Sequence, residues 1–261
     1  MIDTFLEVGW QKFAWDKDTA LWARVALAAA TEVLSDPQHV HWYQCENTWF
    51  VGVDTLPNEL DGSIKDTPLI GPAMTALQSD MGFSSELHRA QISAIFPGYP
   101  RPRANETATA FRYRLQKCGA HIDGLLREGE KRRRYLREPH AWILGLPLTD
   151  CTKETSPLVV WEGSHHIMTR FFSKTLAEYP VEQIYDLDLT DVYLDARREI
   201  FETCTMVPVC ARPGEGYLVH RLTLHGIAPW RSADHSQRII AYFRPKLAQI
   251  TDWPRLGSCT V

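Results

Sequence analysis

Apolar residues recur at helical spacing in the first third of the chain. Within residues 18–34 they follow a period close to 3.6 residues, as expected for one buried helix face. Asp18 or Thr19 is suited to cap the start of this helix, and the run Ser35-Asp36-Pro37 is suited to end it. Residues 72–81 predict a second helix, because Pro72 would occupy a first-turn position that tolerates proline.

From residue 90 onward the pattern changes to short apolar or alternating runs separated by Gly and Pro, which is typical of strands. The predicted strands cover residues 90–96, 110–116, 141–148, 157–161, 204–209, 216–220 and 238–245. One helical insertion, at about 187–204, interrupts them. Strands and helices do not alternate regularly, so a doubly wound parallel sheet is not expected. The pattern favours a mainly β chain with helices (α+β): a jelly-roll core packed against outer helices.

Length and composition set the boundaries of this prediction. The chain has 261 residues and neither a repeat nor a Gly/Ser-rich linker, which predicts one domain over 1–261. We expect a mainly helical N-terminal decoration over 1–90 and the jelly-roll core over 91–250. Nine Trp residues are available to fill the core or to line a small-molecule pocket.

Charge and targeting signals exclude several classes of partner. The net charge of -4 gives no reason to expect nucleic acid or an anionic membrane surface as a partner. The first residues lack the pattern of a secretory signal, and the most apolar helical stretch falls short of a membrane span. Six cysteines without a CxxC pair argue against a zinc ribbon. We therefore expect a cytoplasmic protein with free thiols.

The segment Cys118-Gly-Ala-His-Ile-Asp-Gly-Leu125 carries the first candidate chemistry. His121 and Asp123 are two residues apart, and in an extended chain such residues point to the same side. Two candidates for a third ligand, His220 and His225, follow much later in the chain. Two histidines and one carboxylate on one face of a metal ion form the facial triad of non-haem Fe(II) oxygenases.

The order of further motifs makes the region from about 110 to 245 resemble the phytanoyl-CoA dioxygenase family of 2-oxoglutarate oxygenases. The matching elements, in chain order, are His121-Ile-Asp123, Trp142-Ile143, Ser156-Pro-Leu-Val-Val-Trp-Glu-Gly-Ser-His165, Pro213-Gly-Glu215 with His225-Gly226, and Arg238. The resemblance covers about half of the chain. It implies a double-stranded β-helix, which is a jelly roll, and the cofactors Fe(II), 2-oxoglutarate and O2.

The resemblance also implies roles for individual residues. His121, Asp123 and His225 would bind the metal, with His225 preferred over His220 because it precedes a glycine. Arg238 would bind the distal carboxylate of 2-oxoglutarate, with Arg231 and Arg244 as competitors. Trp142 would flank the co-substrate, although a Trp within the core is almost as reasonable. A carboxylate ligand at Asp123 implies hydroxylation of a small molecule rather than halogenation, with release of succinate and CO2.

Three other histidines and a basic segment can be interpreted as structural or as functional. We expect His220 to be a core residue or to orient a ligand, and His165 and His166 to shape a turn. Residues 127–137 hold six basic side chains. If helical, they would form i,i+4 pairs such as Glu128–Arg132, and a docking surface for an anionic substrate is the alternative.

Two other functions remain open at this level. Zinc also accepts two histidines and a carboxylate, so a zinc-dependent hydrolase on a cupin-like barrel is one alternative. A non-catalytic binding protein of the same fold is the other, although an intact triad argues against it. The sequence predicts neither the substrate nor the oligomeric state.

Overall fold

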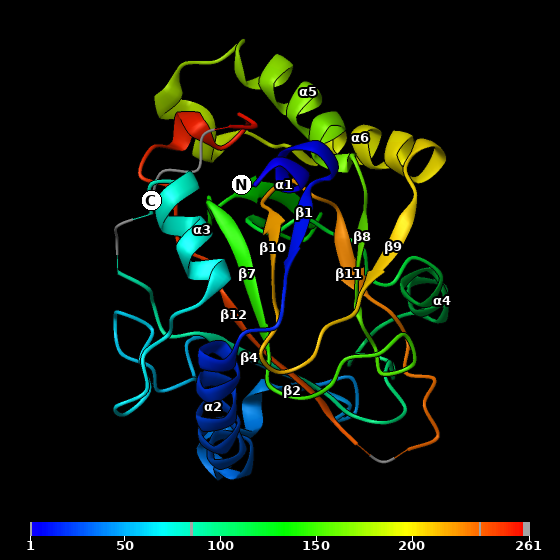
Figure 1. Ribbon diagram of the computed structural model, residues 1–261. Helices are drawn as coiled ribbons and strands as arrows, with labels where there is room; N and C mark the ends of the chain where they lie inside the picture. The colour runs from blue at the N-terminus through cyan, green and yellow to red at the C-terminus, as the bar shows by residue number, and fades with distance from the viewer. Residues whose placement is uncertain (1, 84–85, 235, 258–261) are drawn as a thin grey trace.

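The computed structural model describes residues 2–83, 86–234 and 236–257 and shows strands packed between groups of helices (Figure 1). The α-helices are α1 (Asp3–Val8), α2 (Lys17–Ser35), α3 (Pro72–Asp80), α4 (Ala108–Gln116), α5 (Ser164–Leu176) and α6 (Thr190–Thr203). Short 3-10 helices occur at Pro37–Trp42, Val181–Asp186 and Ile250–Asp252.

Three antiparallel sheets form the β part of the molecule. The largest has seven strands in the order β1-β10-β7-β12-β4-β3-β2, and the second has three in the order β11-β8-β9. The third is the hairpin of β5 and β6. Their bounds are β1 (Trp10–Phe13), β2 (Tyr43–Gln44), β3 (Trp49–Gly52), β4 (Gln91–Ile95), β5 (Leu125–Glu128), β6 (Arg133–Leu136), β7 (Trp142–Pro147), β8 (Leu158–Trp161), β9 (Met206–Val209), β10 (Gly216–His220), β11 (His225–Ile227) and β12 (Arg238–Phe243).

The seven-stranded and three-stranded sheets face each other across a shared apolar layer. Ile143 of β7, Val219 of β10 and Ile240 of β12 meet Leu158 and Val160 of β8 in this layer. Alternate side chains of the same strands point the other way, because successive strand residues face opposite sides of a sheet. Two sheets that bury one face against each other form the jelly roll that the sequence predicts.

Helices cover the outer faces of the roll. Trp22 of α2 and Leu77 of α3 belong to the same buried cluster as Leu144 and Leu218, which lie on the outward side of β7 and β10. The helices α5 and α6 pack on each other and appear together at the top of Figure 1. The helical segments predicted at 18–34, 72–81 and 187–204 are confirmed by α2, α3 and α6.

The predicted strand at residues 110–116 is wrong, because this segment forms helix α4. Its sequence alternates apolar and polar residues, but Phe111, Arg114 and Leu115 are the half-buried positions, which is helical spacing. Thr107 caps the helix: its hydroxyl accepts the backbone N–H of Ala110 at 3.2 Å. The other predicted strands are confirmed by β4, β7, β8, β9, β10 and β12.

The N-terminal ninety residues contribute more than outer helices. The strand β1 pairs with β10 and β3 pairs with β4, so this region also extends both sides of the large sheet. The N-cap of α2 is Asp16 rather than Asp18 or Thr19, since its Oδ1 accepts the backbone N–H groups of both at 2.9 Å. The predicted end at Ser35-Asp36 is confirmed.

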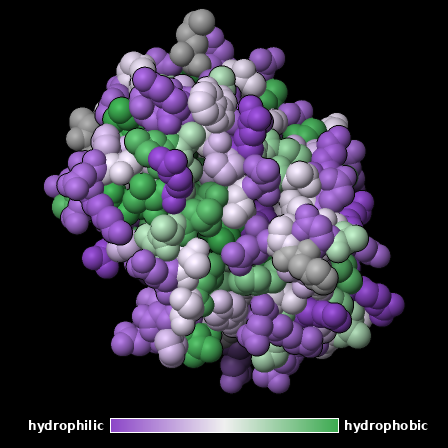
Figure 2. Space-filling view, turned by 60° about the horizontal axis from the view of Figure 1, so that its bottom comes forward, coloured by the Kyte–Doolittle hydropathy of each residue, from purple (hydrophilic) through white to green (hydrophobic). Residues whose placement is uncertain are grey.

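The exterior is mainly polar. Figure 2 shows one face covered mostly by hydrophilic side chains, with apolar side chains in patches between them. Exposed large apolar residues such as Trp15 and Val40 are scattered along the sequence, as on ordinary protein surfaces. Among the described residues, no helix combines the length and the apolar character that crossing a membrane requires.

Candidate metal centre

The backbone brings His121 and His225 side by side. They form an antiparallel bridge in which each backbone N–H donates to the other residue's carbonyl, at 2.8 and 2.9 Å. Gly226 makes this approach possible, because a Cβ there would lie 2.3 Å from the carbonyl oxygen of Cys118. The His-Gly pair is therefore a local requirement for bringing the strand of His225 against the segment that carries His121.

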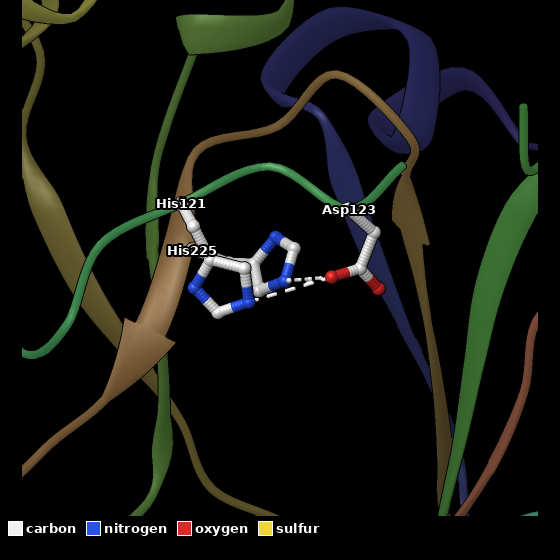
Figure 3. A group of neighbouring side chains, drawn as sticks. All are labelled: His121, Asp123 and His225. Carbon is white, nitrogen blue, oxygen red and sulfur yellow. Dashed lines mark ion pairs between the residues drawn. The ribbon is translucent and has the colours of Figure 1, made fainter. Parts of the chain in front are cut away.

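Hydrogen bonds fix both imidazole rings. The Nδ1 atom of His121 lies 3.0 Å from the carbonyl oxygen of Gly119, and Nδ1 of His225 lies 2.9 Å from that of Thr223. A carbonyl only accepts, so each Nδ1 carries the proton and each Nε2 is free to bind a metal. Figure 3 shows the two rings and the Asp123 carboxylate turned toward one another.

The three ligand atoms converge on one point. Oδ1 of Asp123 lies 3.4 Å from Nε2 of His121 and 3.6 Å from Nε2 of His225. One ligand atom from each residue lies within 4.8 Å of the others. Within the described ranges, this is the one group of His, Cys, Asp and Glu side chains with such geometry. Two imidazoles and one carboxylate oxygen suit a divalent transition metal, so the residues fit the predicted iron.

The electrostatics favour the protonation states that metal binding needs. Burial lowers the pKa of His121 below its usual 6.5, which favours the neutral imidazole. Burial alone would raise the pKa of Asp123. The charge of Arg244, with the two histidine rings beside the carboxylate, outweighs that effect and holds the pKa well below 3.8. Asp123 is therefore an anion at neutral pH, as a ligand must be.

Arg244 holds the oxygen of Asp123 that does not face the histidines. Its Nη1 donates to Oδ2 over 3.1 Å, and its Nη2 donates to Oε1 of Gln91. The backbone N–H of Arg244 donates to Nε2 of His88 at 2.8 Å. This arrangement orients the carboxylate and leaves Oδ1 for a metal. The sequence motifs suggested Arg244 only as an alternative partner of 2-oxoglutarate, whereas its contact in the structure is with Asp123.

Arg238 lies deep between the sheets, on the same side of β12 as Tyr242 and Arg244. Its side chain is fully buried, and Nη1 and Nη2 donate to the hydroxyls of Ser93 (3.4 Å) and Tyr242 (3.1 Å). The Tyr242 hydroxyl also lies 2.8 Å from that of Tyr217. No carboxylate among the described residues pairs with this guanidinium, and its Nε has no hydrogen-bond partner there.

A small cavity of about 130 Å³ connects these groups. Its lining includes all three candidate ligands, Arg244, and the two hydroxyl residues that contact Arg238. Apolar side chains complete the wall: Trp49, Val51, Ile143, Leu158, Val219 and Ile227. Arg238 is not part of the lining itself; it lies behind Ser93 and Tyr242, whose hydroxyls accept its hydrogen bonds.

Trp142 does not reach this pocket. It precedes Ile143 on β7 and therefore faces the opposite side of the sheet, where its ring packs edge-on against Phe83 at 5.3 Å. The structure supports the interpretation of Trp142 as a core residue. Arg231 is exposed in the loop before β12 and does not line the pocket either.

The three other histidines considered in the sequence, His165, His166 and His220, contact the N-terminal helix and the C-terminal segment. Nε2 of His165 lies 3.0 Å from the carbonyl of Leu6, and Nε2 of His166 lies 3.0 Å from that of Glu7. His220 is buried on the outward side of β10, where its Nδ1 accepts the backbone N–H of Leu222 at 3.1 Å. None of the three belongs to the group of side chains whose ligand atoms converge at the triad.

Comparisons with known proteins agree with this fold. No protein-family model matches the chain, and no curated protein matches it. Among solved structures it is similar to the non-heme alpha ketoglutarate dependent carbocyclase SnoK from nogalamycin biosynthesis, with a TM-score of 0.54, 16% identity, and coverage of 96% of this chain and 87% of that one. It is also similar to the non-heme alpha ketoglutarate dependent epimerase SnoN from the same biosynthesis, with a TM-score of 0.50, 14% identity, and coverage of 92% and 78%.

At these identities the likeness shows a shared fold. The chain shares its overall fold with those two enzymes. The narrower resemblance to the phytanoyl-CoA dioxygenase family stays a prediction from the motifs.

Proposed function

We propose that this protein is an Fe(II)- and 2-oxoglutarate-dependent dioxygenase that acts on a small organic molecule. One observation carries the proposal: Nε2 of His121, Nε2 of His225 and Oδ1 of Asp123 converge, while hydrogen bonds from the opposite side of each group fix its orientation. The fold shared with two alpha ketoglutarate dependent enzymes supports the same class.

Arg238 supports 2-oxoglutarate as the co-substrate. A guanidinium buried between two sheets without a carboxylate partner is costly, and an anionic ligand would offset that cost. Its fork geometry suits a carboxylate, and Ser93 and Tyr242 would add hydroxyl contacts at the same end of the pocket. The distal carboxylate of 2-oxoglutarate would then bind at Arg238 and its keto acid end near the triad.

Iron bound at the triad would supply O2 activation coupled to decarboxylation of 2-oxoglutarate to succinate and CO2. The protein's own groups bind and orient: the histidines present Nε2, Arg244 turns the Asp123 carboxylate, and the apolar wall of the pocket excludes water. Because Asp123 supplies a carboxylate ligand, no ligand position is vacated for chloride. We therefore propose hydroxylation rather than halogenation.

The zinc hydrolase alternative accounts for the triad but not for Arg238. A hydrolase needs no dedicated carboxylate clamp inside the roll, whereas the proposed co-substrate requires one. We also propose that 1–261 works as one oxygenase domain, since one buried cluster runs from Phe5 to Trp253. Five unpaired cysteines among the described residues support a reducing compartment such as the cytoplasm, while Cys259 lies outside them.

Succinate formation tests this proposal without knowledge of the substrate. Purified protein with Fe(II), ascorbate, O2 and 2-oxoglutarate should release succinate slowly, because many enzymes of this class turn over the co-substrate uncoupled. The His225→Ala variant and the zinc-loaded wild type should release none. Succinate at equal rates from the wild type and the His225→Ala variant would refute the assignment of the site.

A further inference from the structure

A second, larger cavity of about 750 Å³ adjoins the candidate metal centre. It shares Trp49, His121 and Ile227 with the smaller pocket, so the two spaces meet beside His121. Its far wall consists of the hairpin β5–β6 and one side chain of α6. A molecule bound there would reach His121 at one end and the hairpin at the other.

The far wall carries four arginines. Arg127 of β5 and Arg134 of β6 are direct cross-strand partners, and Arg132 lies two residues before Arg134. Arg197 approaches the same cavity from α6. Like charges directly opposite each other destabilise a hairpin, so this register is costly unless an anion lies between them.

Neighbouring arginines that face away from the cavity are neutralised. Arg133 pairs with Asp188 and Asp191, and Arg137 pairs with Glu128 at the back of the hairpin. The i,i+4 pairs expected for a helical 127–137 do not form, because the segment is a hairpin. Acidic partners are thus provided on one face of the hairpin only.

Of the six arginines that line the cavity, Arg114 pairs with Glu106 and Arg103 lies over the ring of Trp49, whereas the four on the far wall have no acidic partner. No carboxylate within the described ranges forms an ion pair with Arg127, Arg132, Arg134 or Arg197. Arg134 and Arg197 are nevertheless only 7% and 8% exposed, and Nε of Arg197 has no hydrogen-bond partner. A buried, unpaired guanidinium is strongly unfavourable in an empty cavity.

Aromatic rings hold the two buried guanidiniums in place. Cζ of Arg134 lies 4.4 Å from the ring centroid of Tyr193, and Cζ of Arg197 lies 5.2 Å from that of Tyr113. Such stacking preserves the charge and fixes the donors before a ligand arrives. Arginine side chains keep their charge in proteins, so all four are cations.

We propose that this arginine cluster binds a phosphate group of the substrate, which makes the substrate a phosphorylated small molecule. The inference rests on the proposed function, because it places the rest of the substrate between Trp49 and Ile227 and beside His121. Several guanidinium forks around one space match the multiple oxygens and double charge of a phosphate better than the single charge of a carboxylate. The phosphate would anchor the molecule while an apolar carbon segment lies at the metal.

Calorimetry with phenyl phosphate and benzoate as probes tests the cluster directly, at one fixed ionic strength. The wild type should bind phenyl phosphate at least tenfold more tightly than benzoate. Arg197→Gln and Arg127→Gln should each weaken phenyl phosphate binding about tenfold or more. The matched control is Arg198→Gln, whose exposed side chain pairs with Asp195 on the same helix, and it should stay within twofold of the wild type.

Arg127→Gln guards against a folding artefact, because Arg127 is an exposed residue at the cavity rim. The proposal is overturned if benzoate binds as tightly as phenyl phosphate, if neither probe binds, or if Arg127→Gln behaves like Arg198→Gln. Phenyl phosphate binding should persist in His225→Ala, which lacks a proposed metal ligand. Arginine-dependent binding without any succinate formation would retain the cluster and remove the oxygenase proposal, so the two failures are distinguishable.

Discussion

Arg244 donates from Nη1 to Oδ2 of Asp123 over 3.1 Å and leaves Oδ1 facing both histidines. The two residues come from distant parts of the chain, Asp123 before β5 and Arg244 after β12. One charged contact therefore ties the orientation of a candidate ligand to the last strand of the roll. The same contact keeps the carboxyl ionised, which gives Arg244 two effects on metal binding.

Replacing Arg244 should weaken metal binding without abolishing it. In Arg244→Gln the Asp123 carboxylate loses its charged partner, and we expect Fe(II) affinity to fall by about 10- to 100-fold. Arg244→Lys should recover part of the loss, because it restores the charge but not the fork. Anaerobic Fe(II) titration of the three proteins gives the comparison. Wild-type affinity in Arg244→Gln would contradict the positioning role.

Removing the carboxylate itself should have a larger effect. Asp123→Ala is expected to lose tight Fe(II) binding, because only two imidazoles would remain as ligands. Iron stoichiometry by elemental analysis measures this, with far-ultraviolet circular dichroism to confirm that the protein is folded. Asp191→Ala, at an exposed position, is the control and should bind iron normally. An unchanged iron content in Asp123→Ala would show that the ligand assignment is wrong.

Arg238→Gln should reduce 2-oxoglutarate binding while Fe(II) binding persists. Losing a charge-assisted pair to a carboxylate costs on the order of 2–4 kcal/mol, which corresponds to a weakening of tens- to hundreds-fold. Calorimetry on the metal-loaded proteins under anaerobic conditions provides the measurement. The control is Arg231→Gln, since Arg231 is exposed outside the pocket. Equal losses in the two variants would exclude Arg238 as the specific carboxylate partner.

The packing of α1 should make stability depend on pH through His165. Burial lowers the pKa of His165 to about 4, against 6.5 for the free side chain. The unfolded state binds the proton first, so the stabilisation from neutral His165 is complete above pH 6.5 and is lost as the pH falls toward 4. Between pH 7.5 and pH 4.5, the free energy of unfolding should fall by about 2 kcal/mol less in His165→Gln than in the wild type. Denaturant unfolding of both proteins at the two pH values measures this difference. Parallel pH profiles for the two proteins would contradict this account.

The apolar and alternating patterns of the sequence predicted most helices and strands, because those patterns reflect which face of each element is buried. The runs around Trp142, Val160, Val219 and Ile240 alternate or remain apolar as strands between two packed layers must. The segment 110–116 was mispredicted because its alternation competes with a capping Thr107 and with alanines that favour a helix. Short pieces such as β1 carry little pattern of their own and are fixed by pairing with distant strands.

The candidate ligands were predictable because His121 and Asp123 lie two residues apart and His225 precedes a glycine. The role of Arg244 was not, since it depends on a contact between residues far apart in the chain. One signal pointed toward it: residues 238, 242 and 244 share one side of a strand that alternation predicts. The sequence also did not predict that Arg127, Arg132 and Arg134 share one face of a hairpin, because the same residues fit a helix with i,i+4 pairs.

The most direct test of the central claim is absorption spectroscopy under anaerobic conditions. Protein loaded with Fe(II) and then with 2-oxoglutarate should develop a weak visible charge-transfer band, because the keto acid would chelate the metal at the triad. The band should be absent with succinate in place of 2-oxoglutarate and absent in His225→Ala. A wild-type protein that demonstrably holds iron and 2-oxoglutarate but shows no such band would contradict the oxygenase assignment.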